Sequence, residues 1–248
     1  MSSTHPRILG VIPARLASTR LPRKVLREIA GEPMLAWVYA AAKACPQLDE
    51  VVVATDSAEV QALCDQRGWR CLLTSPDLPS GTDRLYAVSR VIAADIYVNI
   101  QGDEPLLLPD HLSAILALFT SEAIDVTTAK VRCTPEDIAN PNAVKVVTAL
   151  DGRALYFSRS TIPFDRDSQG NATYWKHLGL YAYRRAALER FAALAPSELE
   201  LSERLEQLRL LENGISIYVA ETAHDTIGVD TEDDRLRVEK ILLERKSR

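Results

Sequence analysis

Short apolar runs alternate with segments of helical periodicity in the first part of this 248-residue chain. Residues 8–12, 51–56 and 69–73 predict buried strands, because each is a short and mainly apolar run. Between them, residues 32–44 and 57–68 repeat apolar side chains at helical spacing. This alternation predicts an α/β fold with a three-layer, doubly wound and mostly parallel sheet.

A further apolar run, residues 96–100, leads directly into Gln101, Gly102 and Asp103. An acidic residue just past the carboxyl end of a parallel strand can hold Mg²⁺, with water and phosphate oxygens completing the coordination. Gly102 allows the backbone to turn or to approach a ligand closely. The alternative is a strand followed by an ordinary polar turn that Pro105 closes.

A loop rich in cations follows the first predicted strand. It carries Arg15, Arg20, Arg23 and Lys24. Guanidinium groups hold phosphate oxygens through paired hydrogen bonds, lysine supplies a compact charge, and Ser18 adds a hydroxyl donor. The loop therefore predicts a phosphate clamp. It lacks the glycines of a P-loop, so a solvated basic loop is the alternative.

A second polar group opens a predicted helix near residue 80. Ser80 or Thr82 caps this helix, whose first amides can receive a phosphate or the polar edge of a base. Arg84 in the first turn opposes the helix dipole unless an anion lies near it. An ordinary capped helix is the alternative interpretation.

The second half of the chain predicts antiparallel strands with a polar face. Residues 144–150 and 154–158 flank an Asp-Gly pair, which is a strong hairpin signal. His177 and Tyr181 lie at even spacing within residues 177–183, so both fall on one face of a strand. The glycine between them leaves a gap that suits a sugar. The alternative for His177 is a hydrogen-bonded structural histidine.

Three further polar residues lie near the end of the chain. Glu206 and Gln207 fall between the core leucines of a helix predicted over residues 201–211. They either face solvent, as such residues usually do, or point from the helix edge at a ligand's hydroxyls. Asp230 precedes the terminal helix, a position typical of an N-cap.

Composition and charge argue against several classes of function. The formal net charge of −5 opposes a general polyanion-binding surface, so we expect no nucleic-acid partner. No apolar run approaches the roughly 20 residues needed to span a bilayer, and residues 1–7 lack a signal-peptide core, so we expect a cytoplasmic protein. The four cysteines form no CxxC pair, so neither a zinc site nor a redox motif is predicted. The length fits either one large α/β domain or a domain with a smaller annex, and we expect a single domain over residues 1–248.

Several motifs occur in an order that carries a family resemblance. IPARLASTRLP at 12–22, SGTDRL at 80–85 and VNIQGDEP at 98–105 resemble the 3-deoxy-manno-octulosonate cytidylyltransferases, also called CMP-KDO synthetases. The resemblance continues over nearly the whole chain, in NPNAVKVV at 140–147, ALYFSRSTIP at 154–163, HLGLY at 177–181, LEQLR at 205–209 and GVDT at 228–231. Arg23 departs from the family's usual glycine, and Glu32 from its usual lysine.

The resemblance implies a Rossmann-like nucleotidyltransferase fold and Mg²⁺-dependent transfer of CMP from CTP to KDO, for lipopolysaccharide biosynthesis. The implied catalytic residues are Lys24, Asp103 and Asp230, and the two aspartates would hold the metal. The implied CTP-binding residues are Arg15, Ser18, Lys24, Ser80, Thr82, Arg84 and Gln101. The implied sugar-acid-binding residues are Arg159, His177, Tyr181, Glu206 and Gln207.

The family also implies a homodimer formed through a small antiparallel sugar-binding and dimerisation segment at about residues 151–200.

Three alternatives to this function stay open from the sequence. The acceptor could be another sugar acid, such as neuraminate or an 8-amino variant of KDO, or a sugar 1-phosphate. The chain could instead be a catalytically silent nucleotide-binding module. Retention of Asp103 and Asp230 speaks against the silent module, because a pure binder has less need of two metal-binding acids.

Overall fold

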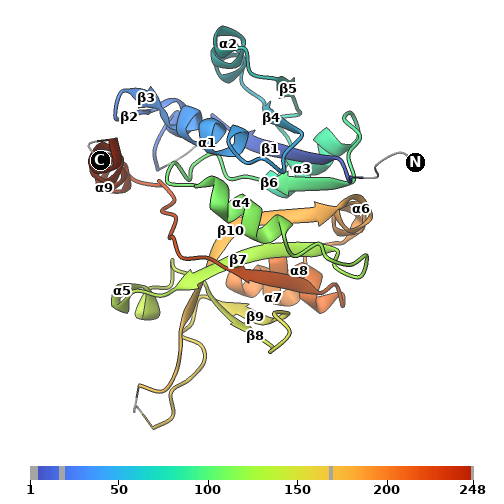
Figure 1. The fold of residues 1–248 in the computed structure, drawn as a ribbon, viewed down its shortest axis with the longest axis vertical. Helices are drawn as coiled ribbons and strands as arrows, with labels where there is room; N and C mark the ends of the chain where they lie inside the picture. Colours follow the sequence, from blue (N-terminus) through green and yellow to red (C-terminus); the bar gives the residue numbers. More distant parts are fainter. Residues whose placement is uncertain (1–4, 17–19, 168–169, 247–248) are drawn as a thin grey trace. The chain divides into compact units, whose positions relative to one another are not determined.

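The computed structural model describes residues 5–16, 20–167 and 170–246 (Figure 1). The chain divides into two compact units. Unit 1 comprises Met1–Ser113 and Thr226–Arg248, and unit 2 comprises Ala114–Asp225. Both units combine helices with β-structure, which confirms the α/β class. The single domain expected over residues 1–248 stays a prediction.

Unit 1 contains a parallel sheet built from the predicted strands. Its strands are β1 (Ile8–Ala14), β4 (Glu50–Thr55), β5 (Cys71–Leu73) and β6 (Ile96–Asn99). They lie in the order β6-β1-β4-β5, with parallel pairing throughout. Val11 at the centre of β1 is opposite Val52 on one side and Asn99 on the other. Both β1 and β4 are almost wholly buried, as expected for strands covered on both faces.

The connections of unit 1 make the sheet doubly wound. From β1 the chain passes through α1 (Met34–Lys43) to β4 and through α2 (Ala58–Arg67) to β5, moving outward in one direction. It then reverses through α3 (Gly81–Ser89) and returns past β1 to β6. Because such crossovers are right-handed, α3 lies on the opposite face of the sheet from α1 and α2. The direction therefore changes between β1 and β6, and ligands bind at the carboxyl ends of strands at such a point.

Local chemistry fixes where these helices begin and end. The Ser57 hydroxyl accepts hydrogen bonds from the amides of Glu59 and Val60, and Gly68 ends α2 in a left-handed conformation, at the two ends of the segment predicted over residues 57–68. Helix α1 begins two residues later than predicted. The short strand β3 (Glu32–Pro33) occupies that position, because it pairs with β2 (Glu28–Ile29) in a small antiparallel sheet.

The carboxyl-terminal part of unit 1 packs as a helix. Helix α9 (Glu232–Lys246) begins just after Asp230, and its Val238 and Leu242 join a buried cluster with Ile29 and Met34. A further helix, α4 (Pro109–Leu116), starts near the end of the first continuous stretch of unit 1. The packing of α9 brings the end of the chain to the residues that follow β1.

Unit 2 is a mixed β-structure with short helices. Its strands are β7 (Val126–Arg132), β8 (Lys145–Thr148), β9 (Ala154–Ser158), β10 (Trp175–Arg184) and β11 (Ile217–Glu221). Strand β7 pairs with β11 in parallel and with β10 in antiparallel orientation. The hairpin β8-β9 confirms the predicted antiparallel segment, and Gly152 in its turn has φ of 84°. The short helices are α5 (Pro135–Ala139), α6 (Arg185–Ala193), α7 (Glu198–Glu203) and α8 (Gln207–Glu212).

The helix predicted over residues 201–211 is wrong in one respect. It is two short helices, α7 and α8, because Arg204 between them adopts a left-handed conformation with φ of 55°. Leu201, expected in the core, is 55% exposed, whereas Leu205 and Leu208 are buried. The break has a physical reason, since the carbonyl oxygens of Glu203 and Arg204 turn to accept hydrogen bonds from a guanidinium group.

Candidate functional site

Strands β1 and β6 approach each other closely where their carboxyl ends meet. A Cβ atom added at Gly102 would lie 2.8 Å from the carbonyl oxygen of Pro13, which is too close for any side chain. The glycine predicted to permit a close approach is therefore required by the backbone itself rather than by a ligand. Asp103 follows directly, so its carboxylate is held at the point where the sheet changes direction.

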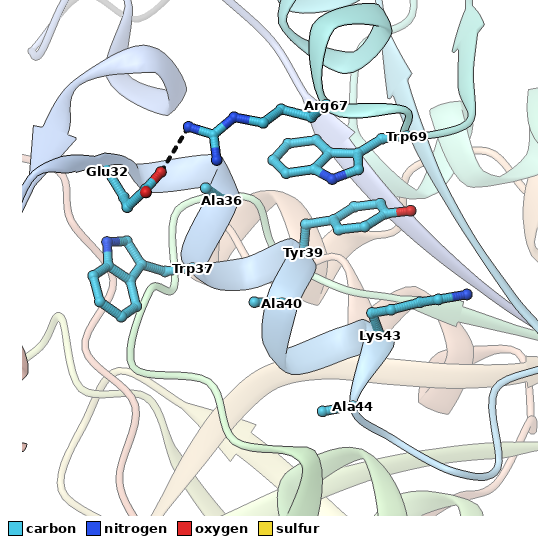
Figure 2. Close-up of a pocket in the computed structure, with 9 residues that line it drawn as sticks. All are labelled: Glu32, Ala36, Trp37, Tyr39, Ala40, Lys43, Ala44, Arg67 and Trp69. Atoms are coloured by element: carbon cyan, nitrogen blue, oxygen red, sulfur yellow. Dashed lines mark hydrogen bonds and ion pairs between the residues drawn. The ribbon is translucent and has the colours of Figure 1, made fainter. Parts of the chain in front are cut away.

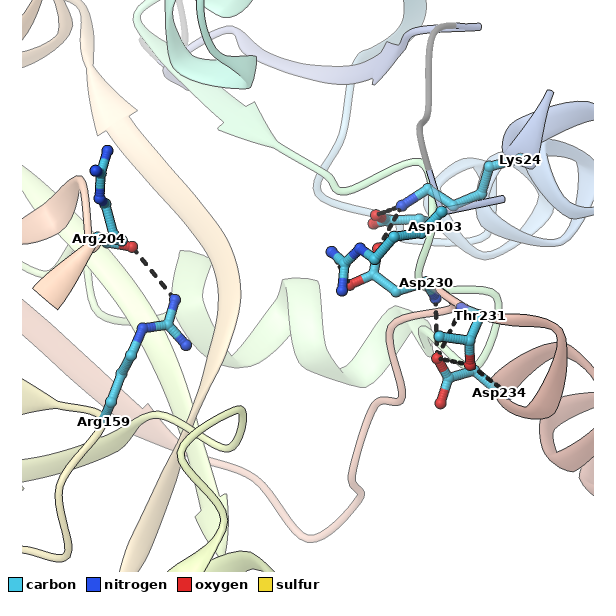
Figure 3. Close-up of polar contacts among 8 residues, drawn as sticks. Lys24, Asp103, Arg159, Arg204, Asp230, Thr231 and Asp234 are labelled. Carbon is cyan, nitrogen blue, oxygen red and sulfur yellow. Dashed lines mark hydrogen bonds and ion pairs between the residues drawn. The ribbon is translucent and has the colours of Figure 1, made fainter. Parts of the chain in front are cut away.

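Three of the predicted site residues converge in unit 1 (Figure 3). Lys24 Nζ donates to Asp103 Oδ2 at 2.6 Å and to Asp230 Oδ1 at 2.9 Å. The lysine side chain is 14% exposed, and the two carboxyl groups are 31% and 42% exposed. One ammonium group thus joins two acids from distant parts of the sequence.

Backbone contacts hold Asp230 in this position. The amide of Val229 donates to the carbonyl oxygen of Asp103 at 2.9 Å. The Asp234 carboxylate accepts hydrogen bonds from the amides of Asp230 and Thr231. Thr231, not Asp230, caps α9 with its hydroxyl, which accepts from the Asp234 amide at 3.2 Å. Asp230 is therefore not the N-cap that its sequence position suggested, and its side chain is available for the site.

The pKa values of Lys24 and Asp234 are shifted by their neighbours. Burial alone would lower the pKa of Lys24, but Asp103 and Asp230 outweigh burial and raise it. Burial raises the pKa of Asp234, but the hydrogen bonds from Thr231 and the backbone amides outweigh that effect, so it lies below its ordinary value. Arg20, one of the four cations of the predicted phosphate clamp, donates from its Nη2 to the second oxygen of Asp230 at 2.9 Å.

The donor set fits a hard divalent cation. Mg²⁺ in nucleotide enzymes takes one or two carboxylates and completes its shell with water and phosphate oxygens. Asp103 and Asp230 already share one cation, the Lys24 ammonium, which marks a position where positive charge is favourable. Among residues 5–16, 20–167 and 170–246, no three His, Cys, Asp or Glu side chains gather into a metal site. Oxygen atoms from outside the chain would have to complete the coordination.

The residues predicted to bind CTP differ in how accessible they are. Arg15 is partly exposed and donates from Nη2 to the carbonyl oxygen of Pro79 at 2.6 Å. Ser80 caps α3 through the amide of Asp83, as predicted, and Gln101 lies partly buried just after β6. Ser18 lies outside the described residues.

Arg84 has a partner within the protein. Its side chain is fully buried, and its guanidinium group pairs with Asp56 at 2.8 Å and also contacts the Thr74 hydroxyl. The anion expected near this first-turn cation is therefore an aspartate of the chain. A guanidinium group with no exposed surface cannot reach a ligand in this structure.

Asn99 was not among the predicted site residues, although the structure makes it a candidate. Asn99 ends β6 and is 2% exposed, and its Nδ2 lies 3.5 Å from the Thr82 hydroxyl oxygen. Its Oδ1 is buried and has no hydrogen-bond partner among the described residues. The sequence signal that could have identified Asn99 is a side-chain amide at the end of the otherwise mainly apolar strand β6. A buried acceptor without a donor costs about 1–3 kcal/mol, so a ligand donor there would be favourable.

In unit 2, His177 lies in an aromatic and polar environment. Its Nε2 is 3.0 Å from the Thr128 hydroxyl, and its ring meets those of Phe157 and Tyr181 at centroid distances of 4.9 and 5.4 Å. The Thr128 hydroxyl also lies within donating distance of two carbonyl oxygens, those of Leu178 at 3.2 Å and Leu180 at 2.7 Å. Burial lowers the pKa of His177 to about 3, so the ring is neutral.

Two polar groups of unit 2 are buried without well-formed hydrogen bonds among the described residues. The Tyr181 hydroxyl lies beside Thr128, and burial raises its pKa well above the ordinary value. Gln207, at the start of α8, is 7% exposed and its Nε2 has no acceptor. Glu206 precedes it and is partly buried. Such groups are suited to pair with hydroxyls of a ligand.

The Arg159 guanidinium group is held by backbone carbonyls, of which Figure 3 shows that of Arg204. Its Nε donates to Glu203 at 2.7 Å, its Nη1 to Pro141 at 3.0 Å, and its Nη2 to Arg204 at 3.4 Å. The Glu203 carboxylate accepts from the Arg159 amide rather than from its guanidinium group. The side chain is therefore oriented, and among the described residues no carboxylate accepts a hydrogen bond from its guanidinium group.

The groove of about 580 Å³ in Figure 2 contains none of the predicted ligand-binding residues. Tyr39 and Trp69 stack there at 4.3 Å, and Arg67 lies over the Trp69 ring. Arg67 also pairs with Glu32 at 2.7 Å, so the acid found at the family's usual lysine position has a cation partner from α2. This exposed pair contributes at most about 1 kcal/mol.

Comparison with known proteins agrees with this geometry. A family model described as cytidylyltransferase matches residues 9–217. The 3-deoxy-manno-octulosonate cytidylyltransferase of Acidobacterium capsulatum is 65% identical over 246 residues, which cover 99% of this chain and 100% of that protein. The enzyme of that name from Geobacter sulfurreducens is 48% identical, covering 95% and 98% of the two chains.

A solved structure extends the similarity to three dimensions. It is described as CMP:2-keto-3-deoxy-manno-octonic acid synthetase complexed with CTP, is 41% identical, and superposes with a TM-score of 0.92 over 96% of this chain and 99% of its own. The chain belongs to the cytidylyltransferase family, among the 3-deoxy-manno-octulosonate cytidylyltransferases.

Proposed function

We propose that this chain transfers CMP from CTP to 3-deoxy-D-manno-octulosonate, releasing pyrophosphate and supplying CMP-KDO for lipopolysaccharide biosynthesis. The observation that carries the proposal is the convergence of Asp103 and Asp230 on one cation where the doubly wound sheet changes direction. Full-length similarity to enzymes named for this reaction supports the choice of substrates.

The reaction is an in-line displacement at phosphorus. The anomeric hydroxyl of the sugar forms a bond to the α-phosphorus, and the bond between that phosphorus and the bridging oxygen to the β-phosphate breaks. Charge grows on the α-phosphate and on the leaving pyrophosphate, so catalysis depends mainly on alignment and on cations placed there. Lys24 and Arg15 supply such cations from the segment after β1. No covalent enzyme intermediate is needed.

Asp103 and Asp230 are the residues that would hold Mg²⁺. When bound, the metal would neutralise phosphate charge and lower the pKa of the attacking hydroxyl, which removes the need for a strong protein base. Asp234 and Thr231 act indirectly, because they fix the backbone that presents Asp230. Arg20 orients Asp230 from its outer oxygen.

The remaining nucleotide contacts are assigned by their position and exposure. Ser80, Thr82 and Gln101 serve the nucleotide, and the buried Asn99 oxygen is a further acceptor beside Thr82. Ser18 keeps its proposed role on the basis of the sequence motif alone. We assign Arg84 to support rather than contact, since its guanidinium group is buried against Asp56. That support fixes the first turn of α3.

The sugar acid is assigned to residues of unit 2. Gln207 and Tyr181 offer buried polar groups without well-formed hydrogen bonds in the described chain, which sugar hydroxyls would satisfy. Neutral His177 supplies a directional partner, and Glu206 adjoins Gln207. Arg159 supplies positive charge for the acid's carboxylate. In this assignment, one set of residues recognises the hydroxyls of the sugar and Arg159 recognises its carboxylate.

We also propose that the chain forms a homodimer through residues 151–200. Large apolar side chains there are exposed, with Leu155 at 55% and Phe164 at 84%. Exposed large apolar side chains of this kind are candidates for contact with a second copy of the chain. In the described chain no helix is both long and apolar enough to cross a membrane. The cytoplasmic location stays a prediction.

Product analysis tests the proposed function directly. The protein is incubated with CTP and Mg²⁺ and, in separate reactions, with KDO, its 8-amino analogue, neuraminate or a sugar 1-phosphate, and products are identified by mass spectrometry. We expect CMP-KDO and pyrophosphate in the reaction with KDO. A CMP product from neuraminate or from the sugar phosphate alone would reassign the acceptor, and CTP binding without any product would support a silent module.

A further inference from the structure

The Lys24 ammonium occupies the position between the two carboxylates that the proposed function assigns to a metal. Its contacts of 2.6 Å to Asp103 and 2.9 Å to Asp230 are charge-assisted hydrogen bonds of normal length. An ammonium group and Mg²⁺ require the same carboxylate oxygens, so the two cations compete for them. Lys24 therefore cannot keep both contacts while a metal binds those oxygens.

From this geometry we infer that Lys24 is a tethered cation that holds Asp103 and Asp230 together and excludes metal until a triphosphate draws the lysine away. This inference rests on the proposed function, because it takes the two acids as the metal site and the triphosphate as the competing anion. The phosphates offer Lys24 a new partner, and its departure frees the carboxylate oxygens. Nucleotide and metal consequently bind together, each raising the affinity for the other.

The surroundings of Lys24 explain why the acids need a cation before substrates arrive. Two carboxylates at one site repel each other, and Asp230 reaches Asp103 from a segment far along the chain. Lys24 is the least exposed member of the group, whereas Arg20 is 67% exposed and pairs with Asp230. Arg20 can therefore remain in place while Lys24 exchanges partners.

The test measures metal binding without nucleotide or sugar. Mn²⁺, whose free form gives a strong electron paramagnetic resonance signal, is titrated into the wild-type protein and into Lys24→Met. Removing a positive charge from direct contact with two carboxylates should tighten Mn²⁺ binding by about tenfold or more. Lys24→Arg, which keeps the charge, should bind as weakly as wild type. Adding Asp103→Asn to Lys24→Met should abolish the gain, which places the new binding at this pair of acids.

Lys176 provides a matched control in unit 2. Its ammonium lies 2.8 Å from Asp225 and 3.8 Å from Asp137 and is 16% exposed, much like Lys24. Asp137 is already bonded to Thr134 in a capping box, so Lys176→Met should not create a metal site. Equal gains in Lys176→Met and Lys24→Met would overturn the inference, and so would unchanged Mn²⁺ affinity in Lys24→Met.

A second variant covers the possibility that Lys24→Met does not fold, as judged by circular dichroism. Lys24→Gln removes the charge and keeps a donor, and the same gain in Mn²⁺ affinity is expected. Because no acceptor sugar is present, the outcome does not depend on which sugar the enzyme uses. Failure to make CMP-KDO would reject the proposed function and leave the metal titration interpretable.

Discussion

Arg23 carries a backbone conformation that a glycine would adopt at lower cost. Its φ and ψ are 58° and 31°, in the left-handed region, immediately before the 3-10 helix Lys24–Leu26. A side chain in this region costs roughly 1–2 kcal/mol. Its guanidinium group pairs with Glu59, but both side chains are more than half exposed, so the pair contributes about 0–1 kcal/mol.

Comparing Arg23→Gly with Arg23→Ala isolates the conformational cost. Both variants lose the Glu59 ion pair, and only glycine relieves the left-handed strain. Glycine also increases the entropy of the unfolded chain, which costs about 0.4–1 kcal/mol. The net expectation is that Arg23→Gly is about 1 kcal/mol more stable than Arg23→Ala, a difference of roughly 2–4 °C in Tm for a chain of this size.

Thermal and urea denaturation followed by tryptophan fluorescence measure the difference, with Glu59→Gln as the control for the ion pair. CTP affinity should stay near wild type in all three variants, because the Arg23 guanidinium group points to Glu59. An alanine variant as stable as the glycine variant would refute the strain argument. A large loss of CTP binding in Arg23→Gly would show instead that the arginine is a phosphate ligand.

Three further predictions concern other parts of the chain. Gly102→Ala should lower both stability and turnover, since its Cβ would contact a backbone oxygen at 2.8 Å; denaturation and kinetics with CTP varied measure both. His177→Ala and Gln207→Ala should each weaken recognition of the sugar acid by roughly 1–3 kcal/mol, seen as a higher KM for the sugar or a lower turnover. The CTP affinity measured by calorimetry should stay unchanged. Collapse of CTP affinity would move these residues to the nucleotide. Leu155→Glu with Phe164→Glu should shift sedimentation toward the monomer, and an unchanged dimer would place the interface elsewhere.

The sheet of unit 1 could be predicted because its signals are local. Apolar runs, a capping serine and a terminating glycine each act over a few residues, so β4, α2 and Gly68 lie where expected. Parallel pairing followed from the alternation of strands and helices. The small antiparallel pairing before α1 was missed, because two-residue strands leave almost no pattern in the sequence.

The candidate site was only partly predictable, because the partner of each side chain depends on the tertiary structure. Asp103 could be predicted because it is an acid that follows an apolar strand. No local sequence signal shows that Asp230 shares the Lys24 ammonium with it. Arg84 illustrates the converse. Its position in a first turn signalled an anion, and only the fold reveals that the anion is Asp56.

The helix predicted over residues 201–211 failed for a similar reason. Leucine spacing favours one continuous helix. In the structure, however, Arg159, which is distant in sequence, donates hydrogen bonds to the carbonyl oxygens of Glu203 and Arg204. At the same place Arg204 adopts a left-handed conformation, and a second helix begins at Gln207. Periodicity describes burial along an element and carries no information about a distant donor.

We propose that Asp103 and Asp230 together support CMP transfer by holding a metal. Pyrophosphate release is measured at saturating CTP and KDO over a range of Mg²⁺ concentrations, for wild type, Asp103→Asn and Asp230→Asn, with Asp225→Asn as the matched control outside the site. Each of the first two substitutions should lower turnover by roughly hundredfold or more with the fold intact, since one charged group that stabilises the transition state is lost. Near wild-type turnover in either variant at ordinary Mg²⁺ would contradict the claim for that residue.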